Sequence, residues 1–246
     1  MHLPDGILPV TVCAAGYATG GALTWYALRK INQQANPRAR VPQAALLTAA
    51  FFVASWIHIP VPPTSVHLIL NGLLGVLLGY YAVPAILIGL FFQAVMFQHG
   101  GLTTLGVNLT MMGLPALLAY VLFRLRFVFM RGAARRGASL PGTALTGFLG
   151  GAAGLGLAVV IFYGLLVTTI PATLDMRMER AAITALTLAH IPVVLLEGVF
   201  TALVVLFLQR VRPDLLDSAS RWSPPVPDAT PDPSLPGIRG ADEPHA

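Results

Sequence analysis

Apolar residues occupy this chain in long, nearly uninterrupted stretches rather than in the periodic patterns typical of water-soluble helices and strands. The longest stretch, residues 43–123, runs for 81 residues without a single Asp, Glu, Lys or Arg. Since one helical crossing of a membrane takes about 20 apolar residues, this stretch alone is long enough to cross several times. Charged or Pro/Gly-rich breaks divide the whole chain into seven predicted spans: 7–29, 43–59, 65–81, 83–98, 102–123, 141–170 and 181–208. We therefore expect an all-α bundle of seven transmembrane helices.

The composition is that of a membrane protein and not of an ordinary water-soluble domain. Of the 246 residues, 56% are hydrophobic and 10% are charged, whereas soluble domains carry about 25% charged residues. The formal net charge of +5 would suit nucleic acid in a soluble protein. However, the sequence has no basic stripe with interleaved aromatic residues, so we expect no nucleic-acid partner. The single cysteine, Cys13, excludes a disulfide within the chain.

Basic residues indicate the orientation in the membrane, because Lys and Arg concentrate in cytoplasmic loops. The segments 29–40 and 124–139 and the exit of the last span hold eleven of the fifteen Lys and Arg residues. The predicted outer loops hold two basic residues, which two acidic residues offset: Arg177, Arg180, Asp175 and Glu179. We therefore predict an amino terminus outside and a carboxyl terminus in the cytoplasm.

The composition changes after the last span. From Pro213 to Ala246 the chain is rich in Pro, Asp and Ser and too poor in apolar residues to form a core. We expect a seven-span membrane domain over residues 1–210 and a Pro-rich, disordered cytoplasmic tail over residues 211–246. Glycine is dense within the spans, which favours close approach of helix backbones in a compact bundle.

The amino terminus carries the pattern with the clearest chemistry. The Met1 amine, the His2 amide nitrogen and the His2 imidazole are joined through five- and six-membered chelate rings, so they can form a near-planar set of three nitrogens. A planar nitrogen field favours Ni(II), Cu(II) and, to some extent, Co(II). His67 is on the same predicted side of the membrane and would supply the missing fourth ligand. The alternative from the residues alone is that Met1 and His2 fray in water.

Three segments resemble one family of membrane proteins: the opening MHLPDGILP, the stretch PPTSVHLILNGLLG at 62–75 and the stretch FQHGGLTTLGVN at 97–108. They look like the substrate-binding membrane component of cobalt and nickel energy-coupling-factor transporters, the CbiM/NikM family, and the similarity extends over about residues 1–210. The resemblance implies capture of Ni(II) or Co(II) from outside in a square-planar set of four nitrogens from Met1, His2 and His67. It also implies a membrane coupling protein, cytoplasmic ATPases and often a small accessory membrane subunit, in a bacterial plasma or inner membrane.

Two other polar residues, Asp5 and Asn71, can each have one of two roles. Asp5 either orients the His2 ring, as carboxylates do for metal-bound histidines, or forms a turn. Asn71 either lines the cavity of His67 or joins neighbouring helices. His58 and His99 are weaker candidates for an entry path.

Two further ionisable residues lie in the last predicted span. His190 and Glu197 are seven residues apart on one helix face, and intramembrane ionisable groups are functional candidates by default. An interhelical structural role for them is at least as well supported by their positions. We place neither residue in the metal site.

The motifs present do not indicate an enzyme. No Gly-x-x-x-x-Gly-Lys-Ser/Thr loop occurs, so the energy for ATP-driven transport must come from other subunits. A membrane metalloprotease would generally show His-Glu-x-x-His, which is absent from the sequence. An autonomous secondary permease or channel is the remaining alternative. It would be expected to show internal repeats and paired charges near the midplane.

Overall fold

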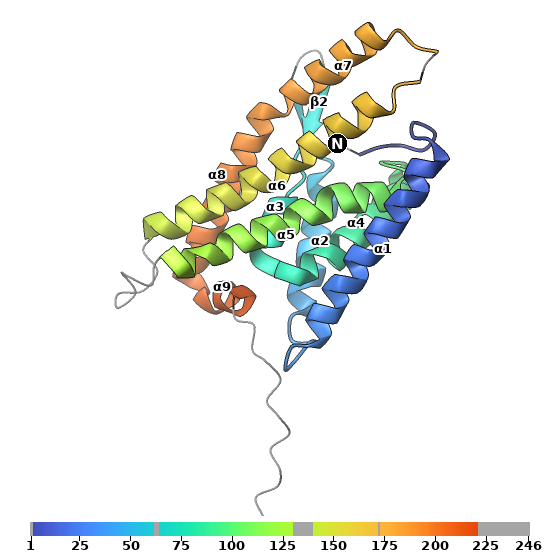
Figure 1. The fold of residues 1–246 in the computed structure, drawn as a ribbon. Coiled ribbons are helices and arrows are strands. Elements are labelled where there is room, and N and C mark those ends of the chain that lie inside the picture. The colour runs from blue at the N-terminus through green and yellow to red at the C-terminus, as the bar shows by residue number, and fades with distance from the viewer. Residues whose placement is uncertain (1, 62–63, 130–139, 172, 221–246) are drawn as a thin grey trace, which may run out of the picture.

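A computed structural model describes residues 2–61, 64–129, 140–171 and 173–220. Figure 1 shows a bundle of packed helices, with a short β-hairpin at the end where the amino terminus lies. The elements, in chain order, are α1 (Val10–Asn32), α2 (Val41–Ala54), β1 (His58–Val61), β2 (Thr64–His67), α3 (Asn71–Leu78), the 3₁₀ turn η1 (Gly79–Tyr81), α4 (Ala82–Phe97), α5 (Leu105–Phe129), α6 (Leu140–Thr168), α7 (Met176–Ala189), α8 (Ile191–Val211) and α9 (Pro213–Ser220).

Each predicted span contains a helix, so the prediction of an all-α helical bundle is confirmed apart from the short hairpin. Within the described residues, four segments are long and apolar enough to cross a membrane: Asn71–Phe97, Leu105–Leu125, Pro141–Thr168 and Met176–Val211. Helix α2 is apolar but shorter. The exact number of crossings stays a prediction.

The second and third spans were predicted with wrong boundaries. Helix α2 ends at Ala54, and the chain then forms the antiparallel hairpin β1–β2, in which His58 pairs with His67. Pro60 lacks the N–H that a helix interior needs, and short runs rich in β-branched residues fit a strand as well as a helix. An otherwise all-α fold therefore carries one small hairpin, which brings His67 to the edge of the bundle core.

Helix α3 is the centre of the bundle, and every residue from Asn71 to Leu78 is buried. Its glycines allow the neighbouring backbones to approach closely. The space that a side chain at Gly75 would need is occupied by the backbone of Ala116 in α5, and Gly154 of α6 lies against Gly72. The compact packing expected from the glycine content is confirmed at these contacts.

The chain reverses direction between α3 and α4. A straight helix over the 27 residues Asn71–Phe97 would be about 40 Å long. Yet the Nε2 atoms of His67 and His99, which flank this segment, are 3.3 Å apart. The turn lies at Gly79, whose φ of +60° suits a residue without a Cβ. This reversal places the residues on both sides of the segment at the same end of the molecule.

The last predicted span is a bent pair of helices rather than one helix. Helix α7 ends at Ala189 and α8 begins at Ile191, with Pro192 in the first turn. Proline cannot donate a backbone hydrogen bond to the preceding turn, which accounts for the break. Asp175 caps the start of α7 by accepting hydrogen bonds from the N–H groups of Arg177 and Met178.

The predicted tail begins later than expected. Residues 213–220 form helix α9, which starts with a proline and buries Leu216 against the bundle, at 3% exposure. Proline is well suited to the first turn of a helix, and one apolar side chain is enough to dock so short an element. Residues 221–246 lie outside the described residues, so their predicted disorder stays a prediction.

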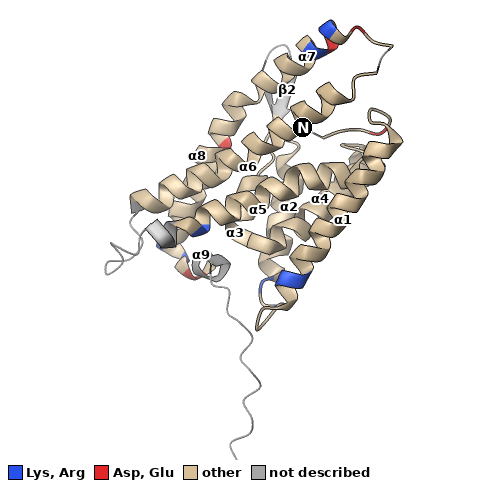
Figure 2. Ribbon diagram, in the orientation of Figure 1, with Lys and Arg blue, Asp and Glu red and all other residues tan. Residues whose placement is uncertain are grey.

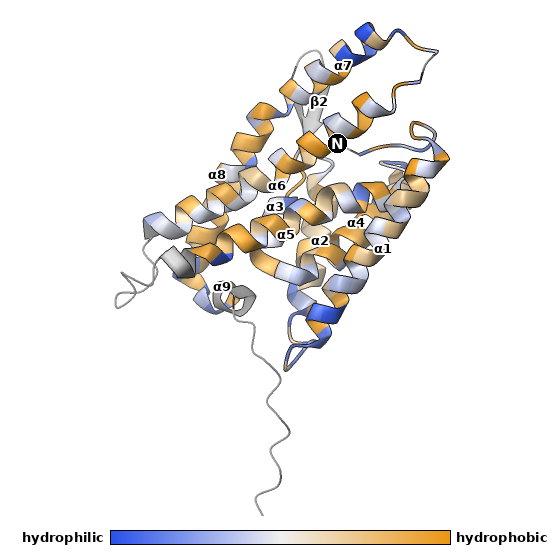
Figure 3. Ribbon diagram, viewed as in Figure 1, coloured by the Kyte–Doolittle hydropathy of each residue, from blue (hydrophilic) through white to orange (hydrophobic). Residues whose placement is uncertain are grey.

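The surface is apolar along the helices and charged at their ends. Figure 3 shows hydrophobic residues along the lengths of the helices, and Figure 2 shows the basic residues gathered at the helix ends. Large apolar side chains face outward, such as Leu46 at 72% and Phe207 at 62% exposure. Helices that are hydrophobic on all sides belong in lipid.

Candidate metal centre

Three histidines from distant parts of the chain meet at the amino-terminal end of the bundle. His2 comes from the amino-terminal segment, His67 from the end of β2, and His99 from the turn after α4. One ring nitrogen of each lies within 4.8 Å of those of the other two. Two nitrogens that bind one metal ion at 2.0–2.1 Å are at most about 4.2 Å apart. The three nitrogens therefore lie near the separations that ligands of one ion have.

The hydrogen bonds of His67 show which of its ring nitrogens could bind a metal ion. Its Nδ1 lies 3.0 Å from the carbonyl oxygen of Leu68, which can only accept, so Nδ1 carries the proton. The Nε2 atom therefore holds the lone pair and accepts a hydrogen bond from Nε2 of His99 at 3.3 Å. A backbone carbonyl that fixes the tautomer in this way is the usual partner of a metal-bound histidine.

The ring nitrogens of His2 are the most unusual polar atoms of the site. Both are buried and neither has a hydrogen-bond partner. Burial is the main cause that holds the pKa of His2 well below its ordinary value, and the amino-terminal charge and the neighbouring His99 and His67 act in the same direction. Burial thus favours the neutral form of His2, whose lone pair can bind a cation.

The amino-terminal segment is held in place by residues that the sequence analysis did not single out. We call residues 2–6 the hook. The side chain of Asn108 in α5 pairs with both backbone groups of Leu3, accepting from its N–H and donating to its carbonyl, each at 3.0 Å. The hydroxyl of Thr104 donates to the same carbonyl. These bonds hold Leu3 against α5, which favours an ordered terminus over fraying, and Met1 lies outside the described residues.

Asp5 fastens the hook to the turn that carries His99. Its carboxylate accepts hydrogen bonds from the N–H of Leu102 and from the N–H and hydroxyl of Thr103. The hydroxyl bond is the main cause that lowers the pKa of Asp5. Gly101 permits this approach because a side chain there would overlap Asp5. Asp5 therefore acts across the chain, and not as a partner of the His2 ring.

The remaining residues that the sequence analysis proposed have other positions and other hydrogen-bond partners. Met1 and the side chain of His58 lie outside the described residues, although the backbone of His58 pairs with that of His67. Asn71 joins helices, because its amide donates to the carbonyls of Met112 and Gly154. His190 bonds its own helix at the Leu186 carbonyl.

Glu197 stands apart from the other candidates because it contacts the segment that follows His67. Its Oε1 accepts hydrogen bonds from the backbone N–H groups of Ile69 and Leu70. This contact joins α8 to the segment that leads into α3, so it fits an interhelical role, and it does not test the functional alternative. Sequence reasoning treated His99 only as a candidate for an entry path and did not single out Asn108, although both lie in the stretch 97–108 on which the family resemblance rests.

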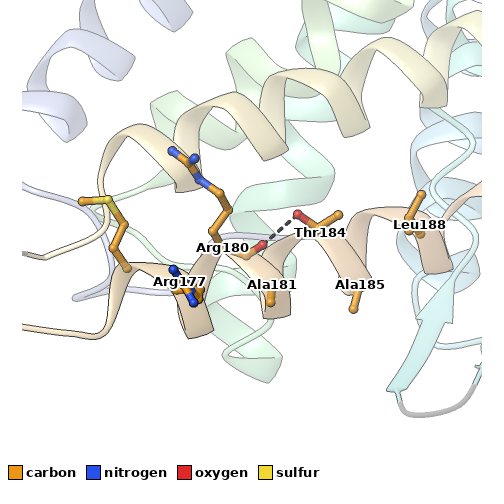
Figure 4. Close-up of a pocket in the computed structure, with 7 residues that line it drawn as sticks. Arg177, Arg180, Ala181, Thr184, Ala185 and Leu188 are labelled. Carbon is orange, nitrogen blue, oxygen red and sulfur yellow. Dashed lines mark hydrogen bonds between the residues drawn. The ribbon is translucent and has the colours of Figure 1, made fainter.

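A separate groove lies along α7, and it contains none of the three histidines. Figure 4 shows Arg177 and Arg180 at one end of the groove and Leu188 at the other, with the Thr184 hydroxyl bonded to the carbonyl of Arg180. One helix forms the whole lining, which is apolar apart from the two arginines and Thr184.

The fold and the histidine cluster place this chain among transition-metal transport proteins. The family model described as "Cobalt uptake substrate-specific transmembrane region" matches residues 2–215. The chain therefore belongs to the CbiM family, a family of metal transport components rather than of enzymes.

Individual relatives agree with this assignment. The chain is 33% identical to the "Fused nickel transport protein NikMN" of Rhodobacter capsulatus, over 93% of this chain and 67% of that protein. It is 32% identical to the "Cobalt transport protein CbiM" of Sorangium cellulosum, over 88% of this chain and 95% of that protein. A crystal structure described as that of a transition metal transporter superposes with a TM-score of 0.70 at 26% identity, covering 86% of this chain and 93% of the other.

Proposed function

We propose that this protein is the substrate-capture subunit of an ATP-driven importer of nickel or cobalt. The ion binds at the outer face in a square-planar set of four nitrogens. These are the Met1 amine, the His2 amide nitrogen, the His2 imidazole and the imidazole of His67. The same site on a bacterial plasma membrane protein serves uptake of either ion, since both accept this nitrogen set.

One observation carries the proposal: both ring nitrogens of His2 are buried without a hydrogen-bond partner, beside Nε2 of His67. Buried polar atoms are nearly always paired, so a pair of orphaned nitrogens points to a ligand. The ring centroids of His2 and His67 are 5.2 Å apart, and their planes differ by 22°. A chelate ring of six members reaches the His2 side chain through Nδ1, and Nε2 of His67 would supply the fourth nitrogen.

Geometry rather than charge selects the ion at this site. No carboxylate lies in the histidine cluster among the described residues, so hard cations such as Mg²⁺ and Ca²⁺ lack the oxygen ligands they require. Hydrogen bonds of Leu3 and Asp5 fasten the hook through groups that are not proposed ligands. Preorganisation of this kind reduces the ordering that binding must impose.

The distribution of charge supports an outer site. Arg29, Lys30 and Arg124 lie near tyrosine and tryptophan rings at the ends of α1 and α5, in the pattern of an interfacial aromatic belt with basic residues on the cytoplasmic side. Those ends are opposite to the histidines along both helices. A membrane coupling protein, cytoplasmic ATPases and a small accessory membrane subunit would complete the importer.

Metal titration tests the proposal. The detergent-solubilised protein with its native Met1 is expected to bind one equivalent of Ni(II) or Co(II), and His2→Ala and His67→Ala are expected to abolish the binding. Uptake by cells is expected to require the ATPase subunits. Unchanged binding in both variants would contradict the capture site, and uptake by this chain alone would identify a secondary permease or channel instead.

A further inference from the structure

The short segment between His67 and α3 has two backbone N–H groups that no regular element satisfies. Ile69 and Leu70 are 2% and 5% exposed, so water does not reach these groups. Leu70 also adopts the left-handed conformation, with a φ of 60°, which is unfavourable for a leucine. A conformation of this kind persists only where the surroundings hold it in place. The direction in which the chain leaves β2 after His67 therefore depends on the groups that contact residues 69 and 70.

The contact comes from α8. Oε1 of Glu197 accepts the N–H of Ile69 and, at 3.0 Å, the N–H of Leu70. The carboxylate thereby caps the start of α3, where free N–H groups and the helix dipole favour a negative charge. One side chain, 127 residues further along the chain, thus fixes the backbone two and three positions after His67.

Burying the carboxylate of Glu197 costs free energy that an apolar side chain, packed at the same place, would not cost. It is 1% exposed inside an apolar bundle, and its second oxygen, Oε2, is buried without a hydrogen-bond partner. Burial of a carboxylate is unfavourable unless its partners compensate. The two backbone donors that compensate here both belong to the His67 segment, so the position of Glu197 is tied to that of His67.

We propose that Glu197 is a positioning residue for metal capture. Its carboxylate oxygen holds the segment after His67 so that Nε2 of His67 faces His2 before the ion arrives. The inference rests on the proposed metal site and adds to it a dependence on α8, a helix that supplies no ligand. Residues that orient a metal ligand typically change metal affinity by 10- to 100-fold when they are replaced.

Three substitutions at Glu197 distinguish the effect of its hydrogen-bond acceptor from the effect of its negative charge. Glu197→Gln keeps an oxygen at the same reach and is expected to retain the Ni(II) absorption bands of the wild type. Glu197→Met removes the acceptor at similar volume and is expected to shift or abolish these bands and to weaken binding by at least about tenfold. Glu197→Asp keeps the charge but shortens the reach by one methylene, and it is expected to resemble Glu197→Met.

The control is Thr201→Val. Thr201 lies one turn further along α8, is also 1% exposed, and its hydroxyl has no hydrogen-bond partner. This variant is expected to bind Ni(II) like the wild type. If Glu197→Met does not fold, the Gln and Asp variants carry the test. A normal Gln variant with an impaired Asp variant supports the inference.

Two results would overturn the inference without touching the proposed function. Wild-type bands and affinity in both Glu197→Met and Glu197→Asp would show that the carboxylate does not position His67. A Gln variant as impaired as the Met variant, or more impaired than the Asp variant, would show that an acceptor at this reach is not what matters. Failure of the wild-type protein to bind either Ni(II) or Co(II) would instead remove the proposed function itself.

Discussion

Replacing Asn108 by leucine removes the side chain that holds the hook against α5. The amide of Asn108 accepts from the N–H of Leu3 and donates to its carbonyl, both at 3.0 Å, and Leu3 is 1% exposed. In Asn108→Leu the carbonyl keeps the hydroxyl of Thr104 as a donor, but the N–H has no acceptor left. The substitution therefore leaves a single buried backbone donor, the N–H of Leu3, without an acceptor.

The magnitude follows from the cost of an unsatisfied buried group, which is about 1–3 kcal/mol. At about 1.4 kcal/mol for each factor of ten, the ratio of closed to open hook falls by roughly 5- to 150-fold. The apparent affinity for Ni(II) falls with the fraction of closed hook, and thus by at most the same factor.

Hydrogen exchange of the Leu3 amide, followed by mass spectrometry of the amino-terminal peptide, measures the opening directly. Its exchange is expected to speed up by roughly 5- to 150-fold, since exchange follows the open population. Thr110→Val is the matched control, because this hydroxyl on the same helix bonds Gly106 and Thr19 and not the hook. Exchange and Ni(II) affinity within twofold of the wild type in Asn108→Leu would refute the reasoning.

Three further predictions concern the same site. Gly101→Ala places a methyl group against Asp5 and is expected to weaken Ni(II) binding by at least about tenfold by overpacking, whereas Gly21→Ala, which meets no atom within 4 Å, should leave the titration unchanged. A hydrogen bond from a threonine hydroxyl lowers the pKa of Asp5, so its contribution to hook order is present above the unfolded pKa of about 3.9 and is lost as the pH falls through the lower folded value. Hydrogen exchange in the hook, corrected for its intrinsic pH dependence, should therefore stay constant from about pH 8 to 5 and rise only below about pH 4; a rise near pH 6 would contradict this assignment. His99→Ala is expected to keep the planar Ni(II) absorption that His67→Ala abolishes, because four nitrogens are complete without it; loss in both variants would indicate a three-histidine site.

Much of the fold could be predicted because the relevant signals are local in the sequence. Long stretches without charge indicate helices in lipid wherever they occur, and each of the seven predicted spans does contain a helix. The hairpin before α3 was missed because residues 58–67 were divided between the ends of two predicted spans. Pro60 argues against a helix interior there, but the pairing of the two short strands is a contact between separate segments that neither segment shows alone.

The candidate site was predictable in part for the same reason. The chelating arrangement at His2 follows from the covalent structure of the first two residues, and His67 follows from its side of the membrane. The contact of His99 with these two depends on the reversal at Gly79 and on the left-handed turn at Gln98, and the anchoring by Asn108 depends on the packing of α5 against the hook. Such long-range contacts have no signature in a single sequence.

The central claim is that the amino-terminal amine and the first amide complete the metal site. The direct test is the ligand-field absorption of the Ni(II)-loaded protein, beside a variant with one extra residue before Met1. The wild type is expected to show the bands of square-planar nitrogen coordination, and the extended variant is expected to lose both the bands and stoichiometric binding. Identical bands in the extended variant would contradict the claim and would leave His2, His67 and His99 as the ligands.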